Sequence, residues 1–205
     1  MAELPAGPPL RHHGRMSASP STPGEAEIGP ALRLVLGLAQ RRPAANLPRR
    51  LNRLFRELQA PEPERPASEI EDLIWALWIS HEDRQAEEMM GAALEAMASR
   101  DLDQARVLLD HLVRRHPDWA EAWNKRATLA FIEHRDVESL ADICRTLKLE
   151  PRHFGAVSGF GQICLRQGHL DEARAAFQIA LSLNPHLEDL REVLDDLGPK
   201  LLMLH

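Results

Sequence analysis

The stretch Gln167–Pro185 has the sequence QGHLDEARAAFQIALSLNP, and it decides the fold. A polar turn is followed by an apolar helical pattern that ends at a proline. Prolines at the same place recur every 34 residues, at Pro117, Pro151 and Pro185. A small side chain recurs with the same period, at Ala105, Ser139 and Ala173. A fixed period of this length is typical of a helical repeat protein.

Three units of 34 residues fill residues 86–187: Ala86–Trp119, Ala120–His153 and Phe154–Leu187. Each unit contains an apolar helix, a short polar turn, a second apolar helix and then proline, which ends the second helix. One helix pair cannot bury its apolar face alone, so the units must stack. The composition, with no Tyr and 5 Phe, also favours helices over strands. The sequence therefore predicts an all-α fold.

The third unit resembles the tetratricopeptide repeat (TPR) family. We therefore expect the chain to be a bacterial-type member of that family. The residues that match the family pattern in this unit are Gly161, Gly168, Ala173, Phe177, Ala180 and Pro185. The second unit supplies Trp123, Ala127 and Pro151 but departs from the pattern at Asp136, Ser139 and Thr146. The first keeps Ala93, Ala105 and Pro117 but has Met89 and Arg100 in place of Trp and the turn Gly. The resemblance implies a right-handed solenoid of helical hairpins.

Helical segments are expected on both sides of the three repeats. Residues 48–85 are expected to form a degenerate helical hairpin, stacked as a fourth pair at the N-terminal end. Its second helix is expected to begin at Ser68, which forms a capping-box pattern with Glu71. Residues 188–205 are expected to hold a C-terminal capping helix and tail, because LEDLREVLDDL gives one buried and one wetted face.

The N-terminal part is rich in Pro, Gly and Ser. Residues 1–29 are expected to be a disordered leader, and residues 30–47 a short helix and linker that Pro30 opens. The apolar residues 31–39 follow Glu25 and Glu27, where an export signal needs positive charge. We therefore expect a cytoplasmic protein, and a periplasmic one if residues 31–39 act as an export leader. Whether the start codon is correctly placed stays open.

Charge is distributed unevenly along the chain. Residues 1–66 hold 10 Lys and Arg against 6 Asp and Glu, a charge of +4, whereas residues 67–205 hold 15 against 25, a charge of −10. An acidic body repels phosphate backbones, so we expect no nucleic-acid partner. No stretch approaches the roughly 18–20 apolar residues that a membrane-spanning helix needs, so we expect no membrane span.

No constellation of residues suggests catalysis or metal binding. The ten His and two Cys form no HExxH or CxxC motif, and no carboxylate–histidine cluster stands at ligand spacing. Acidic pairs such as Asp171–Glu172 lie where carboxylates offset the helix macrodipole. We expect a protein that is not an enzyme, with no catalytic residue, no metal and no cofactor.

The resemblance implies that the first helices of the units line a concave groove for an extended peptide or a partner helix. The positions that the family places in the groove are Met90, Leu94, Met97, Asn124, Thr128, Phe131, Ser158, Gln162 and Leu165. Polar members could bond a peptide backbone, and Met and Phe could pack its side chains. Alternatively, some of them only cover the next helix. The expected function is a non-enzymatic scaffold or adaptor whose partner, a protein or peptide, stays unidentified.

Two other functions stay open at this stage. The stack ends, or a face with Trp75 and Trp78, could pair with another copy, so that the chain would be a structural self-association module and a homo-oligomer. An envelope (periplasmic) assembly factor is the other alternative. A clamp for the C-terminal carboxylate of a chaperone is not expected, because Met90 and Gly159 stand where that clamp needs cations.

Overall fold

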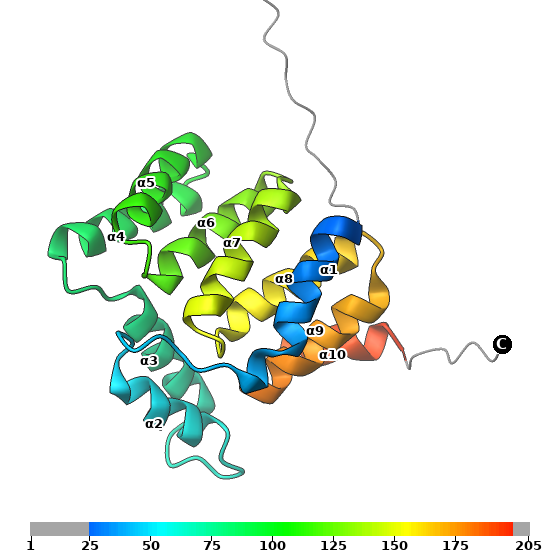
Figure 1. Ribbon diagram of the computed structural model, residues 1–205. Helices are drawn as coiled ribbons and strands as arrows, with labels where there is room; N and C mark the ends of the chain where they lie inside the picture. The colour runs from blue at the N-terminus through cyan, green and yellow to red at the C-terminus, as the bar shows by residue number, and fades with distance from the viewer. Residues whose placement is uncertain (1–24, 199–205) are drawn as a thin grey trace, which may run out of the picture.

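The computed structural model describes residues 25–198, and in that part of the chain it contains α-helices, one short 3-10 helix and no strand. Figure 1 shows the helices packed in antiparallel pairs. The elements in chain order are α1 (Glu25–Leu36), η1 (Leu38–Gln40), α2 (Arg49–Leu58), α3 (Ala67–Ile79), α4 (Arg84–Ala98), α5 (Leu102–Arg115), α6 (Ala120–Ile132), α7 (Asp136–Leu149), α8 (Phe154–Arg166), α9 (Leu170–Leu183) and α10 (Glu188–Asp196). The prediction of an all-α helical solenoid is confirmed.

The three repeats are the pairs α4–α5, α6–α7 and α8–α9. Their turns share one geometry: Arg100, His134 and Gly168 have φ of 66°, 58° and 81°, in the left-handed region. In each turn the next amide donates to a carbonyl five residues earlier, at 2.8 Å, which closes a Schellman motif. Arg100 and His134 adopt this conformation at a cost of about 1–2 kcal/mol each, so the turn is imposed by the packing of the helices on both sides.

Small residues bring the two helices of each pair together. Gly161 faces Phe177 so closely that an added Cβ would lie 2.4 Å from the ring atom Cε1. In the second pair, the Oγ of Ser139 donates to the carbonyl of Ala127 at 2.8 Å, and the Oγ1 of Thr146 donates to the carbonyl of Asp142 at 3.0 Å. Two of the three departures from the family pattern in this unit, Ser139 and Thr146, are therefore small side chains whose hydroxyls have partners inside the helix pair.

We had expected the hairpin α2–α3 to continue the stack at its N-terminal end, and this expectation is wrong. It lies against the turns that join successive repeats, on the lower edge in Figure 1. The indole N–H of Trp119 donates to the carbonyl of Trp78 at 2.8 Å, and the side-chain N–H of Asn184 donates to Glu71 at 2.9 Å. The prediction that Ser68 caps α3 is also wrong: the helix begins at Ala67 after Pro66, and no side chain caps it.

The physical reason for this placement lies on α4. Two positions of each first helix face the preceding second helix, and they are fully buried in α6 as Ala122 and Leu129. One repeat earlier, the same positions are Glu88 and Glu95, and both are exposed. A hairpin stacked there would have to bury two carboxylates, which costs far more than it returns. The first repeat thus ends the stack with a wetted face.

Helix α1 begins at Glu25, five residues before the Pro30 that we expected to open it, so the expected leader 1–29 is wrong for residues 25–29. The helix passes through Pro30 because residues on both sides of it, Ile28 and Ala31, are buried in the largest core cluster. It packs on α7 and α9, the second helices of two repeats. The predicted disorder of residues 1–24 lies outside the described residues.

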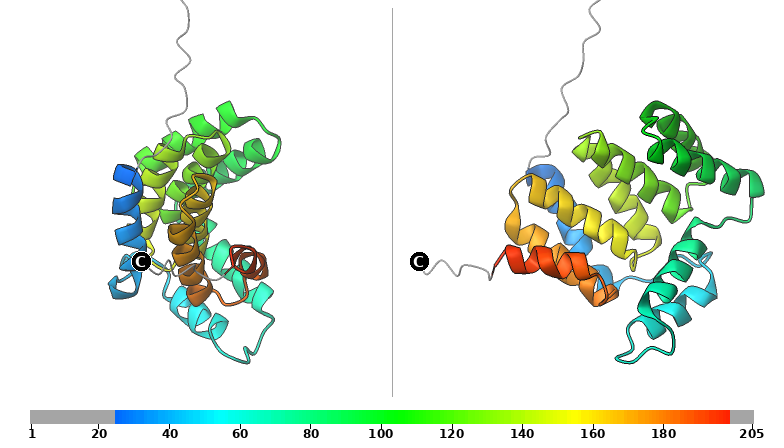
Figure 2. Two further views of the ribbon diagram at one scale, coloured as in Figure 1. Left: turned by 90° about the vertical axis from the view of Figure 1, so that its right-hand side faces the viewer. Right: turned by 180° about the vertical axis from the view of Figure 1, so that it is seen from behind.

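The C-terminal helix α10 packs on α9 and buries Leu190 against the same cluster, while its acidic residues face outward. The two views of Figure 2 show α1 and α10 on opposite sides of the repeats. The tail, residues 199–205, lies outside the described part. Among the described helices, none is long and apolar enough to cross a membrane.

Candidate binding groove

The first helices of the second and third repeats, α6 and α8, enclose a small pocket. It has a volume of about 160 Å³, and the surface exposed inside it is almost entirely apolar, although four of its lining residues are polar. The right-hand view of Figure 2 shows the molecule from behind Figure 1, the side away from α1. The pocket is lined by Asn124, Ala127, Thr128, Phe131, Ser139, Ile143, Gly155, Ala156, Gly159 and Gln162. A pocket of this size suits one apolar side chain better than a cofactor.

The pocket exists because α8 presents glycine to it. A Cβ added at Gly159 would make only an ordinary contact, 3.6 Å from the Cδ1 of Ile143. At Gly155 an added Cβ would lie 2.6 Å from the ring atom Cη2 of Trp75, on the hairpin. Gly159 therefore leaves space for a ligand, whereas Gly155 leaves space for a tryptophan of the same chain.

Four of the nine predicted groove residues line this pocket: Asn124, Thr128, Phe131 and Gln162. Thr128 is exposed, and its hydroxyl donates to the carbonyl of Asn124 at 3.0 Å. Phe131 is half-buried under the guanidinium of Arg166, which lies 3.7 Å from the ring centre. Gln162 is half-buried. The structure thus brings together the groove positions of two helices that are separated by a whole repeat in the sequence.

The other five predicted residues do not line the pocket. Met90 is fully buried in the core of the first repeat, so the structure contradicts its assignment to the groove. Its flexible side chain packs in one cluster with the Trp and Leu side chains of that core. Leu94 and Met97 are half-buried against the same core. Ser158 donates its hydroxyl to the carbonyl of Phe154, and Leu165 packs on the largest cluster.

A buried polar network supports one end of the pocket. His153 and Glu121 are both fully buried, and their side chains approach to 2.7 Å through Nε2 and Oε2. The Nδ1 of His153 accepts the amide of Ala156 at 3.1 Å and caps α8, so Nε2 bears the proton and donates it to Glu121. The carboxylate of Glu121 also pairs with the ammonium of Lys125 at 3.0 Å. It accepts a hydrogen bond from the side-chain Nδ2 of Asn124 at 3.3 Å.

These donors keep Glu121 ionised. Burial acts to raise the pKa of Glu121, but the hydrogen bond from His153 and the charge of Lys125 outweigh it, so the pKa lies below its usual value. The Nδ2 donor of Asn124 is taken up by this network, and Asn124 is only 5% exposed. We had expected Asn124 to bond a ligand; its amide group is instead part of the wall.

Sequence reasoning missed the part that α3 plays at this end of the pocket. The indole of Trp78 stacks on His153 with ring centres 4.0 Å apart, and Trp75 lies edge-on to the same ring. The ammonium of Lys125 lies 5.0 Å from the ring centre of Trp75. Nothing in the sequence signals which repeat a hairpin separated by so many residues will meet. Trp78 is buried and Trp75 is half-buried, and both rings contact His153 of the same chain.

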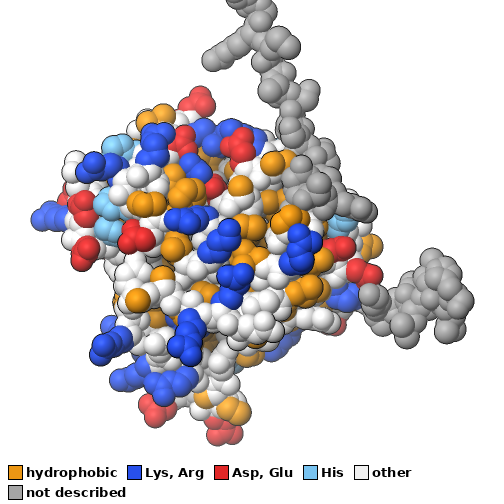
Figure 3. Space-filling view, viewed as in Figure 1, with side chains coloured by type: hydrophobic (Ala, Val, Ile, Leu, Met, Phe, Trp, Pro, Cys, Tyr) orange, Lys and Arg blue, Asp and Glu red, His pale blue; other side chains and the backbone are white. Residues whose placement is uncertain are grey.

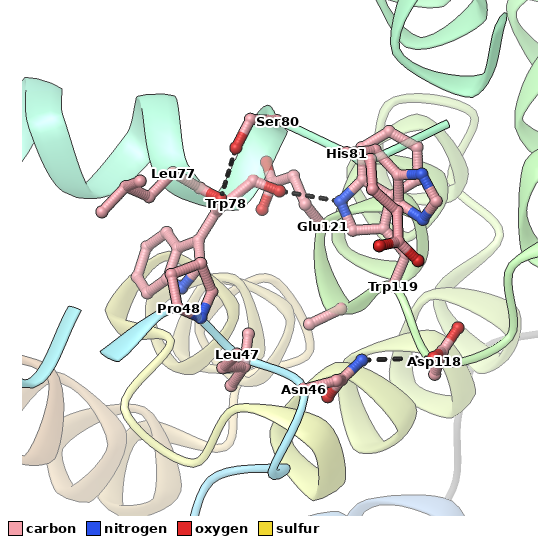
Figure 4. A pocket seen from close by; sticks show the side chains of 12 residues that line it. Asn46, Leu47, Pro48, Leu77, Trp78, Ser80, His81, Asp118, Trp119 and Glu121 are labelled. Carbon is pink, nitrogen blue, oxygen red and sulfur yellow. Dashed lines mark hydrogen bonds between the residues drawn. The ribbon is translucent and has the colours of Figure 1, made fainter. Parts of the chain in front are cut away.

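A second pocket lies beneath the hairpin, where the linker before α2 passes the turn between α5 and α6 (Figure 4). It has a volume of about 460 Å³. Figure 4 shows the side-chain amide of Asn46 directed at the carboxylate of Asp118; its Nδ2 lies 3.2 Å from Oδ2. The figure also shows the hydrogen bond from the indole of Trp119 to the carbonyl of Trp78. Its lining mixes Leu77 with acids and His81. The predicted groove residues are not part of it.

Within residues 25–198 no group of three His, Cys, Asp or Glu side chains is placed to hold a metal ion. Both cysteines are free thiols. Burial raises the pKa of Cys144 and raises that of Cys164 to about 12, so neither thiol is activated as a nucleophile.

Comparison with known proteins identifies the repeats and a relative of nearly the same extent. A family model described as tetratricopeptide repeat matches residues 158–187, and a second with the same description matches residues 90–147. A TPR repeat-containing protein of Rhizobium etli is 32% identical over 165 residues, which are 80% of this chain and 81% of the relative.

Proposed function

Since this chain belongs to the tetratricopeptide repeat family, we propose that it is an adaptor that holds a peptide or helix of a partner protein against α6 and α8. Repeats of this family mediate protein–protein interaction, and proteins of the family are typically non-catalytic scaffolds. The finer proposal concerns where the partner binds. The observation that carries it is the apolar pocket between α6 and α8.

Three features of the pocket support this assignment. Its lining includes the apolar residues Ala127, Ile143 and Gly159 and the polar side chains of Thr128 and Gln162. An apolar side chain of the partner would enter the pocket, and its neighbouring backbone groups would bond the polar side chains. The buried network at Glu121 and His153 holds one end rigid, so little entropy is lost on binding.

The test fills the pocket from one lining position and leaves its other lining side chains unchanged. Gly159→Leu places a side chain in the empty space, whereas Gly91→Leu changes the equivalent position of the first repeat, where an added Cβ meets nothing within 4 Å. Both forms are used to capture proteins from a lysate of the native cell, beside the unchanged protein. We expect a partner that the unchanged protein and Gly91→Leu retain and Gly159→Leu loses. A partner that binds all three forms equally would place the interaction elsewhere.

Location follows as a separate proposal. We propose that residues 31–39 remain part of the folded protein in the cytoplasm, because Leu34, Val35 and Leu38 from this stretch are buried in the core. Removing them would uncover the surfaces of α7 and α9. N-terminal sequencing of the protein from its native cell tests this, and a mature chain that starts after residue 39 would support the periplasmic alternative instead.

A further inference from the structure

The side of the molecule that bears α1 and α7 is strongly basic, and the groove proposal makes no use of it. Residues 28–56 contain seven Arg and no Asp or Glu. Figure 3 shows Lys and Arg side chains over the middle of this side and over α2, with most acidic side chains at its rim. We define the basic surface by six exposed residues: Arg41, Arg42, Arg49, Arg50, Arg145 and Lys148.

Hydrogen bonds along the linker bring these six residues together from two parts of the chain. The amide of Ala44 donates to the carbonyl of Leu149 at 2.8 Å, which sets the linker against the end of α7. The guanidinium of Arg152 donates to Asn52 at 2.6 Å and sets α2 against the following turn. The linker arginines and the α2 arginines therefore flank the end of α7, next to Arg145 and Lys148.

The cations of the basic surface have no anionic partner in the described chain. None of the six forms an ion pair between residues 25 and 198. Two acids lie on the adjoining turns: Glu150 pairs with Arg152 at 2.7 Å, and Asp118 accepts a hydrogen bond from Asn46 and forms no ion pair with any of the six. Unpaired cations on one side repel one another, and a bound anion would relieve that repulsion.

We infer that the basic surface binds an acidic segment of a protein, rich in Asp and Glu. Five of its six cations are Arg, whose planar guanidinium pairs bidentately with carboxylates. A bilayer or a duplex would extend past the patch and meet the acidic remainder, since residues 67–205 have a charge of −10. A short extended segment touches the basic surface alone. The inference does not depend on the groove, which lies on the other side of the repeats.

The experiment measures the fluorescence anisotropy of a labelled peptide of alternating Glu and Ser, titrated with the full chain at low salt. We expect binding that weakens steeply as salt shortens the Debye length, and no binding of the matching Gln–Ser peptide. Arg49→Gln with Arg50→Gln should weaken binding about fivefold or more. The control is Arg114→Gln with Arg115→Gln, an equal change in net charge on α5, and it should leave the affinity within about twofold.

Two results would overturn the inference. Equal losses in the two double variants would mean that the peptide responds only to net charge. Tighter binding of anionic lipid vesicles or duplex DNA than of the acidic peptide, lost in the Arg49/Arg50 variant, would assign the surface to a different class of partner. Circular dichroism of both variants distinguishes lost affinity from lost fold, and Gly159→Leu should bind the acidic peptide normally, which separates this result from a failure of the groove proposal.

Discussion

Glycines of α8 serve opposite purposes within two turns of helix. Gly161 admits the ring of Phe177 and Gly155 admits Trp75, so both are needed for packing. Gly159 has only an ordinary neighbour at 3.6 Å, so packing does not require it, and it costs the helix stability. A residue that weakens a helix without helping its packing is expected where space is needed for a ligand.

Alanine substitutions test this difference directly. Gly161→Ala should destabilise the protein by about 1–3 kcal/mol, because the new Cβ must displace a buried ring. Gly159→Ala should stabilise it by about 0.5–1 kcal/mol through helix propensity. Urea unfolding followed by circular dichroism gives both values. Similar losses at the two positions would show that Gly159 is also a packing residue and that the pocket is not free space.

Two neighbouring histidines, His81 in the turn between α3 and α4 and His116 at the end of α5, predict a dependence on pH. The rings of His81 and His116 lie 4.5 Å apart. Burial and the neighbouring His81 lower the pKa of His116. The unfolded chain therefore binds a proton at His116 more readily, and stability is lost as pH falls from the ordinary His pKa of about 6.5 toward the lower folded value. His116→Gln should flatten the slope of unfolding free energy against pH in this window, and an unchanged slope would contradict the assignment.

At the scale of elements, the repeats follow from the sequence and their attachments do not. The 34-residue period fixes where α4 to α9 begin and end, because each boundary is set by a local turn or proline. The positions of α1 and α2–α3 depend on contacts with residues far along the chain, such as Trp78 with His153. Local patterns contain no information on such pairings. The same limit applies to the site. The repeat pattern predicted that Thr128 and Gln162 lie in the groove, but it did not predict that Met90 is buried.

The docked hairpin predicts a large effect from one core tryptophan. Trp78 is 2% exposed and contacts Phe55, Phe154 and His153. Trp78→Ala should cost about 3–5 kcal/mol in unfolding free energy and should make the loop between α2 and α3 more sensitive to proteolysis. A loss below about 1 kcal/mol, or unchanged proteolysis, would mean that the hairpin is not held on the repeat turns.

For the whole molecule, the acidic outer face of α4 explains why no further repeat stacks on the first one. An inner repeat places Ala122 and Leu129 where the first repeat places Glu88 and Glu95. Glu88→Ala with Glu95→Leu would turn this end into a face that accepts another helix, and sedimentation equilibrium should then show concentration-dependent association. Glu62→Ala with Glu64→Leu makes the same change in charge and composition in the exposed loop before α3 and should leave the mass unchanged. Equal behaviour of the two variants would refute a capping role for α4.

The whole molecule thus offers two surfaces on opposite sides of the repeats, a small apolar groove and a basic surface. The groove is the central claim, and a photo-crosslinking amino acid placed at Thr128 in the native cell tests it most directly. Val107, on α5, is 64% exposed and serves as the control position. We predict an adduct with one protein from position 128 and none with that protein from position 107. An adduct from 107 alone, or equal adducts from both positions, would contradict the account.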